Sequence, residues 1–201
     1  MTKTYEEIYK NFKWNVPEYF NFGMDVVDNW AKKDPNKMAV ISINKDSSNA
    51  DKMTYLDLSQ KTNRFVNVLK KNGMKKGDKV MIILESVPEW YISMIGMTKL
   101  GVIPMPGTSL LTASDIEYRL NSSEGCMVIT DEKHANLIDE VTPKCKTLKH
   151  KMLVRNTRYG WLNFENEMET ASSELTGVDK TKSSDPLLIY FTSGTTGKPK
   201  M

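Results

Sequence analysis

The sequence predicts an α/β fold in which mostly parallel sheets are flanked by helices. Short apolar or β-branched runs alternate with longer segments of helical periodicity along almost the whole chain. The tightest apolar run, residues 80–84, is typical of a strand buried on both faces of a parallel sheet. Thr54 with Asp57, and Thr112 with Asp115, have the spacing of a capping box that starts a helix, with Asp in place of the usual Glu. Strands that alternate with helices are joined by right-handed crossovers, so these observations favour a parallel arrangement.

The segments expected as strands are short, apolar or β-branched, and bounded by turn residues. They are residues 37–43, 79–84, 102–105, 126–130, 151–154 and 187–191. An exposed polar loop over residues 44–52 follows the first strand, and a polar linker over residues 173–185 precedes the last.

The segments expected as helices have apolar residues at 3.6-residue spacing, with caps or breakers at their ends. They are residues 25–33, 54–72, 88–100, 112–120, 134–141 and 162–172. Asp34-Pro35 ends the first helix. Asn72-Gly73 supplies the second with a left-handed C-cap, and Pro88 begins the third as prolines often do.

The composition excludes several classes of protein. The 201 residues include 28 Lys and Arg against 25 Asp and Glu, so the net charge is +3, and basic residues are interspersed with acidic ones. This is not the electrostatic footprint of a nucleic-acid-binding protein. With 39% hydrophobic residues the chain is too apolar to be disordered. No segment is long and apolar enough to span a membrane.

Two features of the sequence bear on the cellular compartment. The two cysteines, Cys126 and Cys145, are too few for a secreted disulfide scaffold and favour a reducing environment. The N-terminus lacks the apolar core of a secretory signal, and it lacks the pattern of a mitochondrial transit peptide because the first arginine is Arg64. We therefore expect a cytoplasmic protein.

The strongest functional signal is the loop that follows the last expected strand. Its residues are Thr192, Ser193, Gly194, Thr195, Thr196, Gly197, Lys198, Pro199 and Lys200. The two glycines let the backbone approach a ligand closely, four hydroxyls and the backbone amides can donate to an anion, and two lysines add positive charge. Open α/β sheets bind ligands beyond the carboxyl ends of their strands, which is where this loop is expected. The loop is therefore predicted to hold phosphates.

This loop differs from a Walker A motif, and ordinary surface turns have a similar composition. Gly194 and Gly197 are three positions apart rather than five, and Pro199 rather than Ser or Thr follows Lys198. The whole nine-residue string after an aliphatic-aromatic strand is nevertheless more specific than a turn. The two histidines, His134 and His150, have no metal-ligand spacing to cysteines or carboxylates, so we expect surface or helix-end positions and no metal site. No catalytic residue is assigned.

Residues 189–200 resemble the AMP-binding signature of the acyl-adenylate-forming superfamily, which includes acyl-CoA synthetases, luciferases and peptide-synthetase adenylation domains. Strings upstream of the signature resemble the medium-chain acyl-CoA synthetases. They are Val16-Pro17-Glu18-Tyr19-Phe20-Asn21-Phe22, Val87-Pro88-Glu89-Trp90, Pro106-Gly107-Thr108, Asp115-Ile116-Glu117-Tyr118-Arg119-Leu120 and Gly160-Trp161. The resemblance covers essentially the whole chain.

The resemblance implies an AMP-forming ligase that works in two steps. A medium-chain fatty or related carboxylic acid attacks the α-phosphorus of ATP to give an acyl-adenylate and pyrophosphate, and CoA then displaces AMP. The implied ligands are ATP, Mg²⁺, CoA as co-substrate and the small carboxylic acid. The loop is then expected to hold the β- and γ-phosphates, with Thr192, Ser193, Thr195 and Thr196 as donors, Lys200 as the cation and Lys198 solvated.

The resemblance also implies a longer enzyme. Residues 1–201 are expected to be part of its large N-terminal AMP-binding domain, without the small C-terminal domain that supplies a catalytic lysine, and to be inactive alone. The acyl chain length and the oligomeric state stay open. Two alternatives also stay open: an adenylation domain that loads a carrier protein, and a non-catalytic nucleotide-binding module.

Overall fold

The fold was analysed in a computed structural model that describes residues 4–43, 50–192, 197 and 199–201. Among these residues, five parallel strands form a sheet with the order β4-β3-β5-β6-β7, and two strands form a separate antiparallel pair, β1-β2. The strands are β1 (Met38–Ile43), β2 (Ala50–Thr54), β3 (Lys79–Ile83), β4 (Ile103–Pro106), β5 (Met127–Thr130), β6 (His150–Leu153) and β7 (Leu162–Asn163). The predicted α/β class with a parallel sheet is confirmed.

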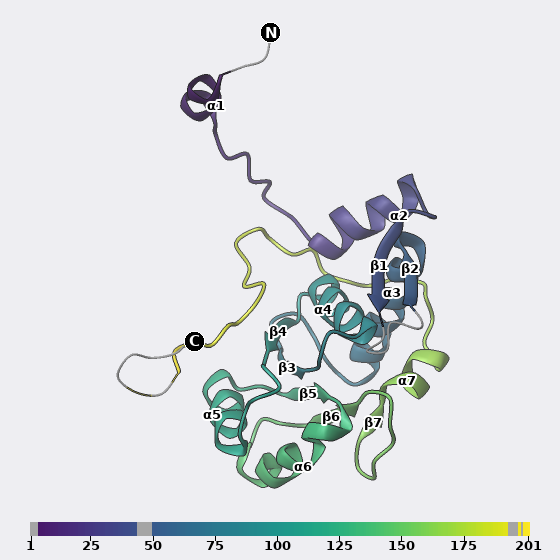
Figure 1. The fold of residues 1–201 in the computed structure, drawn as a ribbon, viewed down its shortest axis with the longest axis vertical. Coiled ribbons are helices and arrows are strands. Elements are labelled where there is room, and N and C mark those ends of the chain that lie inside the picture. The colour runs from purple at the N-terminus through teal and green to yellow at the C-terminus, as the bar shows by residue number, and fades with distance from the viewer. Residues whose placement is uncertain (1–3, 44–49, 193–196, 198) are drawn as a thin grey trace.

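The helices cover both faces of the parallel sheet (Figure 1). The helices of the described residues are α1 (Tyr5–Asn11), the π-helix η1 (Phe22–Asp28), α2 (Asn29–Lys33), α3 (Tyr55–Lys71), α4 (Pro88–Leu100), α5 (Ala113–Ser123), α6 (Glu132–Val141), the 3₁₀-helix η2 (Thr142–Lys144) and α7 (Phe164–Thr170). Helices α3 and α4 pack on one face, and α5 and α6 pack on the other.

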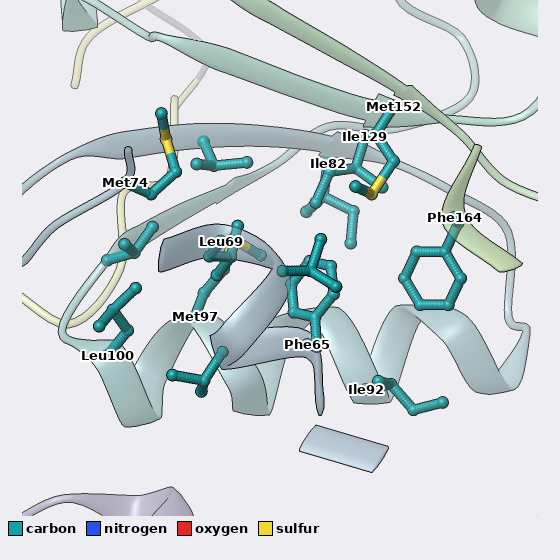
Figure 2. Packing of buried hydrophobic residues seen from close by; sticks show 14 of the residues in the cluster. Phe65, Leu69, Met74, Ile82, Ile92, Met97, Leu100, Ile129, Met152 and Phe164 are labelled. Atoms are coloured by element: carbon teal, nitrogen blue, oxygen red, sulfur yellow. The ribbon is translucent and has the colours of Figure 1, made fainter. Parts of the chain in front are cut away.

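The core alternates residue by residue along the central strands. In β3, Val80 and Ile82 face α3 and α4, whereas Met81 and Ile83 face α5 and α6. Figure 2 shows the first of these layers, in which Phe65 of α3 lies beside Phe164 with a ring-centroid distance of 5.5 Å. Each fully buried aliphatic side chain contributes about 1.5–3 kcal/mol of transfer free energy, so the two layers dominate the stability of this unit.

Both predicted capping boxes form. At the start of α3, Asp57 donates its backbone N–H to Thr54 Oγ1 at 3.1 Å, and Thr54 donates its own N–H to Asp57 Oδ2 at 2.9 Å. Thr112 and Asp115 make the same reciprocal pair at the start of α5. The hydrogen bonds from Thr54 hold the pKa of Asp57 below its usual 3.8. Gly73, with φ of +77°, ends α3 as expected.

A buried ion pair joins three helices, and the sequence analysis did not anticipate it. The side chain of Lys99 on α4 is fully buried, and its Nζ lies 2.5 Å from Asp28 Oδ1 and 2.7 Å from Asn63 Oδ1. Ser59 Oγ donates to the same oxygen of Asp28 at 2.6 Å. Burial lowers the pKa of Lys99, and Asp28 opposes this by favouring the charged form. The cluster therefore fixes η1 against α3 and α4.

Several element boundaries were predicted wrongly. The helix expected over residues 162–172 begins at Phe164, because Leu162 and Asn163 form β7 and the Asn163 side chain caps the helix by accepting from Asn166 N. The expected loop over residues 44–52 contains the start of β2, whose residues Ala50, Asp51 and Lys52 are all exposed. An exposed strand has no apolar alternation to signal it, and its pairing with β1 rests on backbone hydrogen bonds. Residues 44–49 lie outside the described residues. The helix expected from residue 25 begins earlier, at Phe22, because the Asn21 side chain accepts a hydrogen bond from Met24 N and caps it.

The strand predicted over residues 187–191 is also wrong. The segment runs beside β4, the edge strand, and Ile189 donates its backbone N–H to Pro104 O at 3.1 Å without continuing as a ladder. Ile103 donates its own backbone N–H toward β3. Because backbone groups point alternately to the two sides of a strand, those of Pro104 and Pro106 point away from β3, to the outer edge of the sheet. Prolines lack an N–H, so this edge offers carbonyl oxygens and no donors at those positions.

Helix α1 projects away from the rest of the molecule (Figure 1), and its Tyr5 and Tyr9 side chains are exposed. None of the helices within the described ranges has both the length and the apolar character needed to cross a bilayer.

Removing the carboxylate of the buried pair should strongly destabilise the protein. Asp28→Asn is expected to lower the free energy of unfolding by about 3 kcal/mol, because the Lys99 ammonium then stays buried without its counter-charge. The matched control is Glu167→Gln, which breaks the more exposed pair with Lys71 and is expected to change the value by less than about 0.5 kcal/mol. Urea unfolding of both variants measures the difference, and equal effects would contradict this account.

The capping carboxylate of α3 should stabilise the fold only above the pH at which it is protonated. Because the folded-state pKa of Asp57 lies below 3.8, its contribution is complete above 3.8 and is lost as the pH falls through the folded-state value. Asp57→Asn is expected to lower the free energy of unfolding by about 0.5 kcal/mol at pH 7, and the difference should vanish in acid. Urea unfolding across a pH series measures this, with Asp179→Asn, an exposed carboxylate, as the control; a pH-independent difference would argue against it.

Candidate functional site

The candidate site begins where the chain leaves the edge of the sheet. After Ile189 contacts β4, Thr192 and Lys200 pair as an antiparallel bridge. Thr192 N donates to Lys200 O at 2.9 Å, and Lys200 N donates to Thr192 O at 3.1 Å. The exchange of both hydrogen bonds closes the intervening chain into a loop whose two ends are held together.

The structure describes four of the nine predicted phosphate-holding residues: Thr192, Gly197, Pro199 and Lys200. The other five, Ser193, Gly194, Thr195, Thr196 and Lys198, lie outside the described residues. Thr192, Gly197 and Lys200 are exposed to solvent and Pro199 is half-buried. A Cβ placed on Gly197 would meet no atom within 4 Å, so at this position the backbone is open to an approaching ligand.

Helix α5 supports the base of the loop from one side. Tyr118 donates its hydroxyl hydrogen to Pro199 O at 2.9 Å, and its ring meets the ring of Phe191 edge to face at 6.3 Å. The guanidinium of the next residue, Arg119, lies 4.8 Å from the centroid of the Phe191 ring. Phe191 directly precedes the loop and Pro199 lies near its end, so α5 contacts both ends. In the sequence, the string that contains Tyr118 and Arg119 carries the family resemblance but no sign of this contact.

The described part of the loop suits an anion. Thr192 and Lys200 are paired at its base through their backbones, the Thr192 hydroxyl donates to Lys200 O at 3.4 Å, and both residues carry side-chain donors. In the part of the chain that the structure describes, no group of three or more His, Cys, Asp or Glu side chains could hold a metal ion.

A hollow of about 730 Å³, which no sequence pattern predicted, lies beyond the carboxyl ends of β3 and β6. It is lined by Ser42, Ile43, Glu85, Ser86, Val87, Ser109 and Arg155. Arg155 has a φ of +61°, and its guanidinium donates two 3.0 Å hydrogen bonds to Glu89, which raise the pKa of Arg155. Because the Arg155 guanidinium is already paired with the Glu89 carboxylate, its charge is less available to bind a phosphate in this hollow. The lining residues come from segments far apart in the chain, so no local pattern could reveal the hollow.

The expected position of His134 is only partly right. It lies in the first turn of α6, yet it is buried, with 2% of its surface exposed. Its Nδ1 lies 2.8 Å from Asp131 Oδ1 and its Nε2 lies 3.1 Å from Ser109 O. The ring therefore ties α6 to the loop after β4, a structural role that a lone histidine in the sequence does not signal.

Curated relatives match nearly the whole chain. The mitochondrial acyl-coenzyme A synthetase ACSM3 of Pongo abelii is 39% identical over 204 residues, 98% of this chain and 34% of the relative. ACSM3 of Homo sapiens is 38% identical with the same coverage, and the mitochondrial acyl-coenzyme A synthetase ACSM5 of Mus musculus is 38% identical over 92% of this chain and 33% of its own length. The chain spans about a third of the length of these relatives. The predicted resemblance to acyl-CoA synthetases is confirmed.

These relatives also overturn the expected compartment. We expected a cytoplasmic protein, and the relatives are mitochondrial, so that expectation is wrong. Targeting depends on a segment that is recognised separately from the folded domain, so the composition of the domain does not reveal the compartment. A low cysteine content indicates a reducing compartment but does not distinguish one such compartment from another.

The fold and the family agree. The crystal structure of the anthranilate CoA ligase AuaEII in complex with anthranoyl-AMP superposes with a TM-score of 0.79 at 25% identity, covering 92% of this chain and 34% of that one. A sequence model of the family described as AMP-binding enzyme matches residues 27–201, which include the whole parallel sheet, the helices on both its faces and the loop closed by Thr192 and Lys200. The chain therefore belongs to the AMP-binding enzyme family.

Proposed function

We propose that the protein containing these residues is an AMP-forming acyl-CoA synthetase. A carboxylate attacks the α-phosphorus of ATP, which forms the acyl-adenylate and releases pyrophosphate; the CoA thiol then displaces AMP and forms the thioester. The observation that carries the proposal is the family match over residues 27–201 combined with 38–39% identity to acyl-coenzyme A synthetases. A medium-chain fatty or related acid is the substrate class that we propose from the sequence strings upstream of the loop.

In this reaction the loop of residues 192–200 holds the β- and γ-phosphates of ATP. Negative charge develops on the pyrophosphate as it leaves, and fixed donors aimed at developing charge are an effective form of catalysis. We assign Thr192, Ser193, Thr195 and Thr196 as hydroxyl donors and Lys200 as the cation. The exposed ends of the loop, held together by the Thr192–Lys200 bridge, support this assignment.

Gly194, Gly197, Lys198 and Pro199 complete the proposed loop. The glycines let the backbone amides reach the phosphates, and the open space around Gly197 suits that role. We propose that Lys198 is solvated and that Pro199 fixes the backbone before Lys200.

Magnesium enters the proposal as the counter-ion of the nucleotide. Mg²⁺ keeps several waters and is commonly held through substrate phosphates and one or two carboxylates. The described residues at the loop include a hydroxyl and a lysine but no carboxylate, so they suit phosphate oxygens better than a metal ion. No step is therefore assigned to a magnesium ligand in this chain.

We also propose that residues 1–201 are part of a larger nucleotide-binding domain. The relatives are about three times as long as this chain, and the solved ligase is covered to the same extent. The acid-binding and CoA-binding contacts are then expected to involve residues outside this chain.

The reaction is tested on the full-length protein that contains this chain. Acid-dependent exchange of labelled pyrophosphate into ATP measures the first step, and formation of acyl-CoA measures the second. Exchange with thioester formation is the expected result. Exchange that proceeds without a CoA thioester would remove the CoA step and favour loading of a carrier protein.

Lys200→Ala tests the proposed role of the loop cation. It is expected to lower kcat/KM for ATP in the exchange reaction by about a hundredfold, because a charge that stabilises the leaving pyrophosphate is lost. KM for the carboxylic acid should stay unchanged. Lys10→Ala removes an exposed lysine of α1 and serves as the control; equal activity of the two variants would exclude the assignment.

A further inference from the structure

The peptide unit between Pro199 and Lys200 is held from both sides. Its N–H donates to Thr192 O at 3.1 Å, and its carbonyl oxygen accepts from the Tyr118 hydroxyl at 2.9 Å. In a trans peptide, the N–H and C=O point in opposite directions. The two hydrogen bonds therefore fix the plane of the peptide from which the Lys200 backbone and side chain extend.

The bond from Tyr118 adds a restraint that the bridge alone does not supply. The Thr192–Lys200 bridge holds the two ends of the loop to each other, whereas Tyr118 belongs to α5 and ties them to the body of the molecule. The edge-to-face contact of its ring with Phe191 holds the other side of the loop against the same helix. Tyr118 thus contacts both ends of the loop from a rigid element.

The surroundings of Tyr118 do not suit a phosphate. It borders a hollow of about 440 Å³ that is also lined by Asp115 and Glu117. Hydrogen bonds from Thr112 lower the pKa of Asp115, so this carboxylate is charged at neutral pH. The Glu117 carboxylate is paired with the Lys144 ammonium at 3.4 Å, so Asp115 is the carboxylate that disfavours an anion there. The hydroxyl hydrogen of Tyr118 is directed to Pro199 O, and this hydrogen bond places the hydroxyl against the backbone of the loop.

We propose that Tyr118 is a positioning residue for Lys200, which acts through the carbonyl oxygen of Pro199 to fix the orientation of that lysine toward the phosphates of ATP. The inference rests on the proposed function, in which Lys200 binds those phosphates. It adds a residue of α5, more than 70 positions upstream of the loop, to the machinery for the first step.

Tyr118→Phe is the decisive variant, since it keeps the ring against Phe191 and removes the one hydroxyl. In the full-length enzyme, kcat/KM for ATP in pyrophosphate exchange is expected to fall roughly fivefold, the size of one ordinary hydrogen bond. KM for the carboxylic acid and the thermal midpoint should stay at their wild-type values. Tyr159→Phe, which removes the hydroxyl of a fully exposed tyrosine, is the matched control and should behave as wild type.

A double-mutant cycle separates positioning from general support of the fold. If Tyr118 acts through Lys200, the double variant Tyr118→Phe with Lys200→Ala should have the same kcat/KM for ATP as Lys200→Ala alone. Wild-type kcat/KM for ATP in Tyr118→Phe, or losses that multiply in the double variant, would overturn the inference.

Failure of the proposed function can be told apart from failure of this inference. A wild-type enzyme that shows no acid-dependent exchange removes the proposed function. Calorimetry with pyrophosphate on the wild type and on Tyr118→Phe, below the measured unfolding midpoint of each, then still tests the positioning. A roughly fivefold weaker affinity in Tyr118→Phe supports it, and equal affinities overturn it.

Discussion

Residues 80–83 of β3 and all of β5 are buried on both faces, and the rest of the structure follows from this constraint. Their side chains alternate between two hydrophobic layers, so helices must cover both faces. A polar group carried into these layers is costly to leave without a partner. Thr130 on β5 avoids this cost by donating its hydroxyl to Ile83 O, and Lys99 avoids it by pairing with Asp28 and Asn63. The capping boxes then let α3 and α5 begin directly after extended chain.

The parts of the fold that could be predicted from sequence are those in which burial leaves a pattern. Residues 80–83 are apolar because both their faces are covered, and α3 shows a 3.6-residue stripe because one side is covered. β2 leaves no pattern since its first residues are exposed. The segment 187–191 has the composition of a strand, yet the neighbouring prolines limit its pairing. This effect depends on which strand lies at the edge of the sheet beside residues 187–191, and the sequence pattern of a single segment does not reveal its neighbour.

The candidate site likewise has a part that the sequence predicts, the loop, and a part that it does not, the contacts that support the loop. The loop is a continuous string whose glycines, hydroxyls and lysines lie next to one another, so its chemistry is visible without a structure. Its support is not local, because Tyr118 is brought to Pro199 by the packing of α5. The hollow that contains Arg155 is assembled from separate segments as well. Contacts of this kind depend on tertiary structure, and the spacing of residues within one segment does not predict them.

The prolines of β4 also have a consequence for association between molecules. An exposed edge strand normally recruits a second chain through its free backbone donors and acceptors, which is a common start of aggregation. At the outer edge of β4, Pro104 and Pro106 leave acceptors without donors, so an incoming strand finds only half of the partners that it needs. During synthesis β4 emerges well before residues 187–191. Throughout that interval the missing N–H groups of Pro104 and Pro106 protect the outer edge of β4 against pairing with another molecule.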